Sequence, residues 1–184
     1  HESSPSPRTL GLDSVAAKQV RMPLRYATRE APLATASVAT SALAASVHKP
    51  ALLLLLHGTG DNEHGLLPIV DALPAHSAAR RFKVASLRAP LSAPYGGFRW
   101  FEGYSAAPEP QALRQSIADS CDQLFGFIES APDTLGTAPD RVYLLGFSQG
   151  ATMGWTAMLS RWPRPRFIKG AMLLSGRLMP QLRG

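Results

Sequence analysis

Hydrophobic positions along the chain fall into two alternating patterns from residue 50 onward. Short runs of apolar residues predict four strands, at residues 50–56, 82–87, 142–145 and 167–174. Apolar residues at helical spacing predict three helices between them, at residues 66–76, 113–128 and 149–160. The run at 50–56 is continuously apolar, which is typical of a strand buried on both faces of a sheet. This alternation predicts a three-layer α/β fold with a mostly parallel sheet.

The chain before residue 50 is less regular. Residues 1–19 are rich in Ser and Pro near their start, and we expect a disordered lead-in there. Residues 20–27 predict a first strand, which Pro23 favours placing at a sheet edge, whereas residues 30–49 fit either a strand or a loop. Farther on, residues 88–110 contain several prolines and predict a long loop. With no repeat or linker in view, residues 20–184 are interpreted as a single domain.

The strongest chemical signal is Gly-Phe-Ser-Gln-Gly at residues 146–150, which fits the pattern G-x-S-x-G. It lies between a predicted apolar strand and a predicted helix, as a nucleophile elbow requires. The glycines let neighbouring backbone approach closely, and the helix N-terminus points its positive dipole end at developing negative charge. We therefore predict Ser148 as a catalytic nucleophile. The alternative is a glycine-rich turn that contains a serine with no chemical role.

A second signal, His-Gly-Thr-Gly-Asp, occupies residues 57–61 directly after the buried strand. Glycines there allow a backbone N–H to face a reacting carbonyl. The expected oxyanion donors are the backbone N–H groups of Thr59 and of Gln149, the residue after the candidate nucleophile. We interpret His57 as holding this loop by hydrogen bonds rather than as a base. Asp61 either orients the loop or is an ordinary turn aspartate.

Together these segments resemble the phospholipase/carboxylesterase family of serine hydrolases, which includes acyl-protein thioesterases. The resemblance is carried by residues 53–61, 97–102 and 146–150, with a Ser-Gly turn at 175–176, and it extends over roughly residues 50–180. It implies an α/β-hydrolase fold and hydrolysis of carboxylic esters or thioesters through an acyl-enzyme on Ser148. It implies no metal and no organic cofactor, and a small-molecule or lipid acyl ester as substrate. Trp100 and Phe101 are candidate pocket residues, with core filling as the alternative.

The triad acid and base that the resemblance implies are missing from the sequence after Ser148. Residues 149–184 contain no Asp, Glu or His, although this fold orders its triad Ser, then acid, then His. We expect a chain truncated before both residues and before the C-terminal strands of the sheet, and therefore nearly inactive by itself. We expect truncation because a chain that ended here would leave the apolar strand at 167–174 on an open edge of the sheet, which is an aggregation liability. The alternative is a natural, non-catalytic ligand-binding protein on the same fold.

Composition and charge limit the classes of protein to which this chain can belong. Its 45% hydrophobic and 17% charged residues are those of a globular protein, and the longest aliphatic run, residues 51–56, is too short for a membrane span. The net charge of +6 arises from residues 161–184, which are basic and contain no acid. We expect no nucleic-acid binding, since no recognised motif accompanies this charge. No signal peptide is visible, so the cytoplasm is the default expectation; the sequence does not indicate an oligomeric state.

Overall fold

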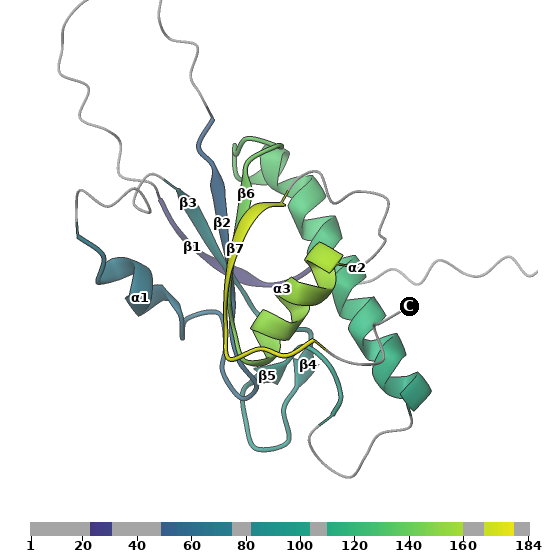
Figure 1. The fold of residues 1–184 in the computed structure, drawn as a ribbon. Coiled ribbons are helices and arrows are strands. Elements are labelled where there is room, and N and C mark those ends of the chain that lie inside the picture. The colour runs from purple at the N-terminus through teal and green to yellow at the C-terminus, as the bar shows by residue number, and fades with distance from the viewer. Residues whose placement is uncertain (1–22, 31–48, 75–81, 104–109, 160–167, 179–184) are drawn as a thin grey trace, which may run out of the picture.

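A five-stranded sheet forms the centre of the molecule (Figure 1). The computed structural model describes residues 23–30, 49–74, 82–103, 110–159 and 168–178. The strands of the sheet are β1 (Tyr26–Arg29), β3 (Lys83–Leu87), β2 (Leu52–Leu56), β6 (Val142–Phe147) and β7 (Ile168–Leu174), in that spatial order. All neighbours pair in parallel except β1 and β3, which are antiparallel. The mostly parallel sheet is therefore confirmed.

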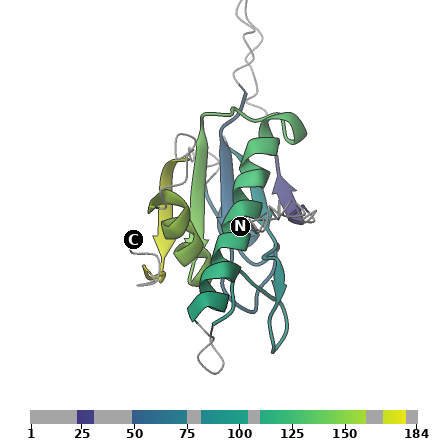
Figure 2. The same cartoon turned by 90° about the vertical axis from the view of Figure 1, so that its right-hand side faces the viewer.

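Helices cover the sheet on both faces, which makes three layers (Figures 1 and 2). The helices are α1 (Leu67–Asp71), α2 (Pro110–Thr134) and α3 (Gln149–Leu159). Alternate leucines of β2 belong to different layers: Leu52, Leu54 and Leu56 join the core beneath α2 and α3, whereas Leu55 joins the core beneath α1. Because side chains of a strand alternate between faces, a strand buried on both faces must be apolar throughout.

The predicted elements agree with the structure apart from their ends and one loop. The loop predicted over 88–110 is wrong in part, because β4 (Leu91–Ser92) and β5 (Phe98–Arg99) form a short antiparallel hairpin and α2 begins at Pro110. The first strand is an edge strand as predicted, but it runs from Tyr26 to Arg29, beyond Pro23. The predicted lead-in at 1–19 lies outside the described residues, and the single-domain boundary remains a prediction.

The topology gathers the chemical motifs at one edge of the sheet. The carboxyl ends of β2, β3, β6 and β7 lie together because these strands are parallel. Ligands bind at this edge in open α/β sheets. The segments that follow β2 and β6 are the two glycine-rich motifs, so both meet there. Among the described helices, none has the length and apolar character needed to cross a bilayer.

Candidate active site

Ser148 stands at a sharp turn between β6 and α3. Its φ of 52° lies in the left-handed region, which costs a non-glycine residue about 1–3 kcal/mol. The Ser148 N–H donates to the carbonyl oxygen of Leu174 at 2.9 Å, and the Ser148 carbonyl accepts the Thr152 N–H at 3.1 Å, the first bond of α3. Neighbouring strand and helix thus hold the turn, which leaves the half-buried side chain at the carboxyl edge of the sheet.

The two glycines of the motif are required by close packing. A Cβ on Gly150 would lie 2.0 Å from the carbonyl oxygen of Leu56, at the end of β2. A Cβ on Gly146 would lie 2.7 Å from the carbonyl oxygen of Gly150. Both distances are far below van der Waals contact, so only glycine allows α3 to start directly above β2 and β6. This is the backbone arrangement expected of a nucleophile elbow.

The loop after β2 passes immediately beside Ser148. A Cβ on Gly58 would lie 3.3 Å from the Cβ of Ser148 and 3.1 Å from the ring of Phe147. Within the described residues, Gly60 and Asp61 donate their N–H groups to backbone carbonyls, but the exposed Thr59 has no backbone acceptor. Gln149 is the first residue of α3, where N–H groups have no intrahelical acceptor. The geometry thus brings the two expected donor residues to the same edge as Ser148.

His57 is buried and holds the loop, which fits its sequence interpretation. The Ala89 N–H donates to Nε2 at 3.1 Å, and Nδ1 lies 2.7 Å from the Gly58 carbonyl oxygen. Because a backbone N–H can only donate, Nε2 must accept, and the ring proton stays on Nδ1. Desolvation by burial lowers the pKa of His57, against smaller raising effects from the Gly58 carbonyl, Asp61 and Glu63. A neutral ring with both nitrogens engaged has no free lone pair for a substrate proton.

The far end of the same loop is fixed to β5. The Gly60 N–H donates to the Phe98 carbonyl at 2.9 Å, and the Phe98 N–H donates to the Asp61 carbonyl at 2.8 Å. The Asp61 carboxylate accepts the Asn62 N–H at 2.8 Å, a local contact that both interpretations of this residue allow. The guanidinium of Arg88 lies 4.5 Å from the centre of the Phe98 ring. Residues 57–61 are therefore held at both ends.

A partly buried ion pair supports that end. The Arg88 Nε donates to the Glu63 carboxylate at 2.6 Å, and Nη2 donates to its other oxygen, which makes a bidentate pair. The Glu63 side chain is 8% exposed. Its hydrogen bonds from Arg88 lower the pKa of Glu63 to about 2, despite the opposing effect of burial. The pair is thus fully ionised near neutral pH.

The side chain of Gln149 has a partner set that sequence reasoning missed. Its Oε1 accepts the Trp100 N–H at 2.6 Å, and its Nε2 donates to the Phe101 carbonyl at 2.9 Å. The residue is 0% exposed. The sequence offered only a Gln directly after the elbow serine, because its burial, and hence its need for hydrogen-bond partners, depends on the fold.

Comparison with known proteins decides the family. A family model described as Phospholipase/Carboxylesterase matches residues 39–183. The chain belongs to this family. The family resemblance seen in the sequence is thereby confirmed, together with the α/β-hydrolase fold.

Relatives of this phospholipase/carboxylesterase chain are longer. An uncharacterized hydrolase of Mycosarcoma maydis, UM10204, is 28% identical over 118 residues, which are 59% of this chain and 42% of that protein. The carboxylesterase of Mesorhizobium loti is 28% identical with a TM-score of 0.55, over 68% of this chain and 55% of its own. Esterase PE8 shares the fold with a TM-score of 0.61 at 23% identity, over 84% of this chain and 65% of its own. The chain thus spans about two fifths to two thirds of these proteins.

Trp100 and Phe101 lie in the core of this family member rather than on an open pocket. Their exposed fractions are 0% and 2%, and both belong to the cluster beneath α2 and α3. The Trp100 indole N–H donates to the His57 carbonyl at 2.9 Å. The core-filling alternative describes these side chains, because almost none of their surface is left for a substrate.

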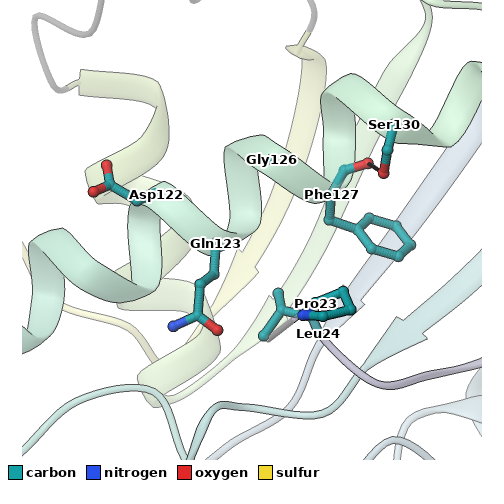
Figure 3. Close-up of a pocket in the computed structure, with 7 residues that line it drawn as sticks. All are labelled: Pro23, Leu24, Asp122, Gln123, Gly126, Phe127 and Ser130. Atoms are coloured by element: carbon teal, nitrogen blue, oxygen red, sulfur yellow. Dashed lines mark hydrogen bonds between the residues drawn. The ribbon is translucent and has the colours of Figure 1, made fainter. Parts of the chain in front are cut away.

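Two adjoining cavities of about 340 Å³ each lie away from Ser148. Figure 3 shows the first, between α2 and the segment before β1; its lining residues are Pro23, Leu24, Asp122, Gln123, Gly126, Phe127 and Ser130. The second shares Pro23, Leu24 and Gln123 and extends to Arg88 and Phe98. Neither lining includes Ser148, Thr59 or Gln149, so the candidate site rests on the elbow geometry. Among the described residues, no group of three His, Cys, Asp or Glu side chains is placed to hold a metal ion.

Proposed function

We propose that this protein is a serine-dependent carboxylic ester or thioester hydrolase that forms an acyl-enzyme on Ser148. The observation that supports this proposal most strongly is the positive φ of 52° at Ser148, at a strand–helix turn that only Gly146 and Gly150 permit. The loop of residues 57–61 packs against this turn at Gly58, where an added Cβ would lie 3.3 Å from the Cβ of Ser148. Serine hydrolases use this combination to join a nucleophile to an oxyanion hole.

The proposed reaction proceeds in two steps. In acylation, Ser148 Oγ attacks the carbonyl carbon, its proton passes to a base, and the alcohol or thiol leaves with a proton. The N–H groups of Thr59 and Gln149 stabilise the tetrahedral oxyanion, assisted by the positive end of α3. In deacylation, water attacks the acyl carbon, the acid is released and Ser148 regains its proton. His57 is not this base, because both of its ring nitrogens are engaged. We assign the base to none of residues 1–184.

The surface beside Ser148 favours an acyl substrate. Phe147 is 45% exposed and lies against Gly58, so it presents an apolar surface next to the nucleophile. An acyl chain could be buried there at the moment the carbonyl reaches Ser148. A small-molecule or lipid acyl ester fits this surface.

The test is hydrolysis of 4-nitrophenyl acyl esters by the protein expressed from its complete reading frame. We expect wild type to be active and Ser148→Ala to lose essentially all turnover. Ser175→Ala is the matched control, because Ser175 is also a serine at positive φ, 56°, following a strand of the same sheet. Equal rates for wild type and Ser148→Ala would contradict the proposal.

A second candidate function is non-catalytic ligand binding on the same fold. This alternative keeps the fold and the elbow without the chemistry, because a fold does not by itself imply a function. Under this alternative a fluorophosphonate probe would fail to label Ser148 in the whole protein, whereas labelling would support the esterase.

A further inference from the structure

We propose that the side-chain amide of Gln149 is a positioning residue that fixes the two oxyanion donors relative to each other. The proposal rests on the esterase function proposed above. It concerns the Gln149 side chain, which does not touch the substrate, and not the Gln149 backbone N–H, which we expect to contact the oxyanion. The side chain acts through the segment of residues 100–102, which we call the Trp100 loop.

The first link joins Gln149 to the Trp100 loop. Both polar atoms of its amide are used: Oε1 accepts the Trp100 N–H at 2.6 Å and Nε2 donates to the Phe101 carbonyl at 2.9 Å. Two antiparallel bonds from a planar amide fix both distance and orientation. Because Gln149 is 0% exposed, water does not compete for these bonds.

The second link joins the Trp100 loop to the loop that carries Thr59. The Trp100 indole N–H donates to the His57 carbonyl at 2.9 Å, two residues before Thr59. Gly150 packs against the same stretch, since a Cβ there would lie 2.6 Å from the His57 carbonyl oxygen. The start of α3 thus contacts His57 in two ways: through the Gln149 side chain and the Trp100 loop, and directly through Gly150.

The Trp100 loop is itself anchored to α2. The Ser120 hydroxyl donates to the Trp100 carbonyl, and the Glu102 N–H donates to the Ser116 hydroxyl at 3.2 Å. The loop is thus a fixed part of the framework, and Gln149 connects α3 to it. Displacing that connection changes where the Gln149 and Thr59 N–H groups point without removing either donor. Oxyanion stabilisation depends on donors that are held in place before the reaction.

The experiment compares Gln149→Met with Thr156→Val in the whole protein. Met keeps the length of the side chain and removes both hydrogen bonds. Thr156 is the matched control: it is buried in the same helix and its hydroxyl donates to the Thr152 carbonyl at 2.9 Å, within α3 itself. Both variants should be less thermostable than wild type, so stability alone does not distinguish them.

The distinguishing readout is the split between kcat and KM for a 4-nitrophenyl ester. We expect Gln149→Met to lower kcat about 100-fold with little change in KM, because misplaced donors weaken only transition-state binding. Affinity for a trifluoromethyl ketone, which forms a tetrahedral adduct, should fall in parallel. Thr156→Val should keep kcat within about twofold of wild type. A Gln149→Met enzyme with the kcat of Thr156→Val would overturn the proposal.

Amide hydrogen exchange provides a readout that does not depend on turnover. Gln149→Met should accelerate exchange in residues 57–61 and 98–103, whereas Thr156→Val should not. Unchanged exchange in both segments of Gln149→Met would also overturn the proposal. If wild type lacks esterase activity, the proposed function fails, and the exchange measurement alone then decides whether Gln149 holds the two loops.

Discussion

Single atoms decide the geometry at Ser148. The turn places a serine in the left-handed region and brings α3 so close to β2 that a Gly150 Cβ would lie 2.0 Å from a backbone oxygen. That strain is offset by the hydrogen bond that the Ser148 N–H donates to Leu174, by the one that Ser148 accepts from Thr152, and by burial of α3. Such strain persists only where the surroundings determine the conformation.

Substitution at two helical glycines should therefore have opposite effects. Gly150→Ala should destabilise the protein by more than about 3 kcal/mol, because the new methyl group meets rigid backbone. Gly126→Ala, in α2, should stabilise it by about 0.5–1 kcal/mol, since a Cβ there meets nothing within 4 Å and alanine has the higher helix propensity. Urea unfolding of both variants measures the two changes. A harmless Gly150→Ala would mean that α3 does not approach β2 as described.

His57 makes stability depend on pH in a defined direction. Burial lowers its pKa below the ordinary 6.5, so the unfolded chain binds the proton more tightly than the folded protein. Its contribution to stability is present above pH 6.5 and is lost as the pH falls from there toward the folded value. The slope approaches about 1.4 kcal/mol per pH unit within that window.

Urea unfolding between pH 7.5 and 5 tests this direction. His57→Gln should be less stable at pH 7.5 and should show a flatter pH dependence than wild type. His64→Gln is the control, because the His64 side chain is 70% exposed. If His57→Gln kept the full wild-type dependence of unfolding free energy on pH, another group would be responsible for it.

At the scale of elements, the loop of residues 57–61 is a bridge between three parts of the fold. His57 binds the turn after β3, Gly60 and Asp61 pair with β5, and Gly58 lies beside the elbow. The Arg88–Glu63 pair supports β5, because the Arg88 guanidinium lies over the Phe98 ring. A loop held at so many points is preorganised, which is what an oxyanion donor needs. The sequence predicted that this loop and the elbow would supply donors to one oxyanion hole, and the structure shows that both follow neighbouring parallel strands.

The Glu63–Arg88 pair should stabilise this bridge except in acid. Because the folded pKa of Glu63 is about 2, below its usual 4.5, its contribution is present above pH 4.5 and is lost as the pH falls toward 2. Glu63→Gln should lower Tm and reduce the dependence of Tm on pH between 4.5 and 2.5. Glu102→Gln, which breaks a pair with Arg99 at a side chain that is 44% exposed, should change Tm much less. Equal effects of both would contradict the account.

The strand β7 presents apolar side chains at an edge of the sheet. Met172 is 59% exposed and Leu174 is 45% exposed, and β7 pairs only with β6 among the described strands. Exposed apolar edges promote association between chains. We predict that Met172→Lys reduces concentration-dependent association of the 184-residue chain, measured by light scattering. Ile69→Lys, at an exposed apolar residue of α1, should not; equal effects would mean that general surface charge is responsible.

At the scale of the whole molecule, the pattern of the sequence predicted the layered fold and the meeting of the two glycine-rich motifs. Periodicity identifies elements, and parallel topology then determines which loops share an edge. It could not predict the β4–β5 hairpin, which is stabilised by pairing of Asp61 with Phe98 across 37 residues of chain. Nor could it show that Gln149 binds the Trp100 loop, because that partnership depends on side-chain packing between distant segments.

The family and the fold are established for this chain, whereas the role of Ser148 as a nucleophile is our proposal. The chain matches the Phospholipase/Carboxylesterase model over residues 39–183, yet spans 42% to 65% of the three relatives described above. The activity of the whole protein is therefore the point that most needs measurement.

The most direct measurement is intact-mass analysis of the whole protein after treatment with a fluorophosphonate, followed by peptide mapping. We predict a single adduct on the peptide that contains Ser148, absent from Ser148→Ala and retained in Ser175→Ala. An unlabelled wild-type protein, or an adduct that maps elsewhere, would contradict the assignment of Ser148 as the nucleophile of an esterase.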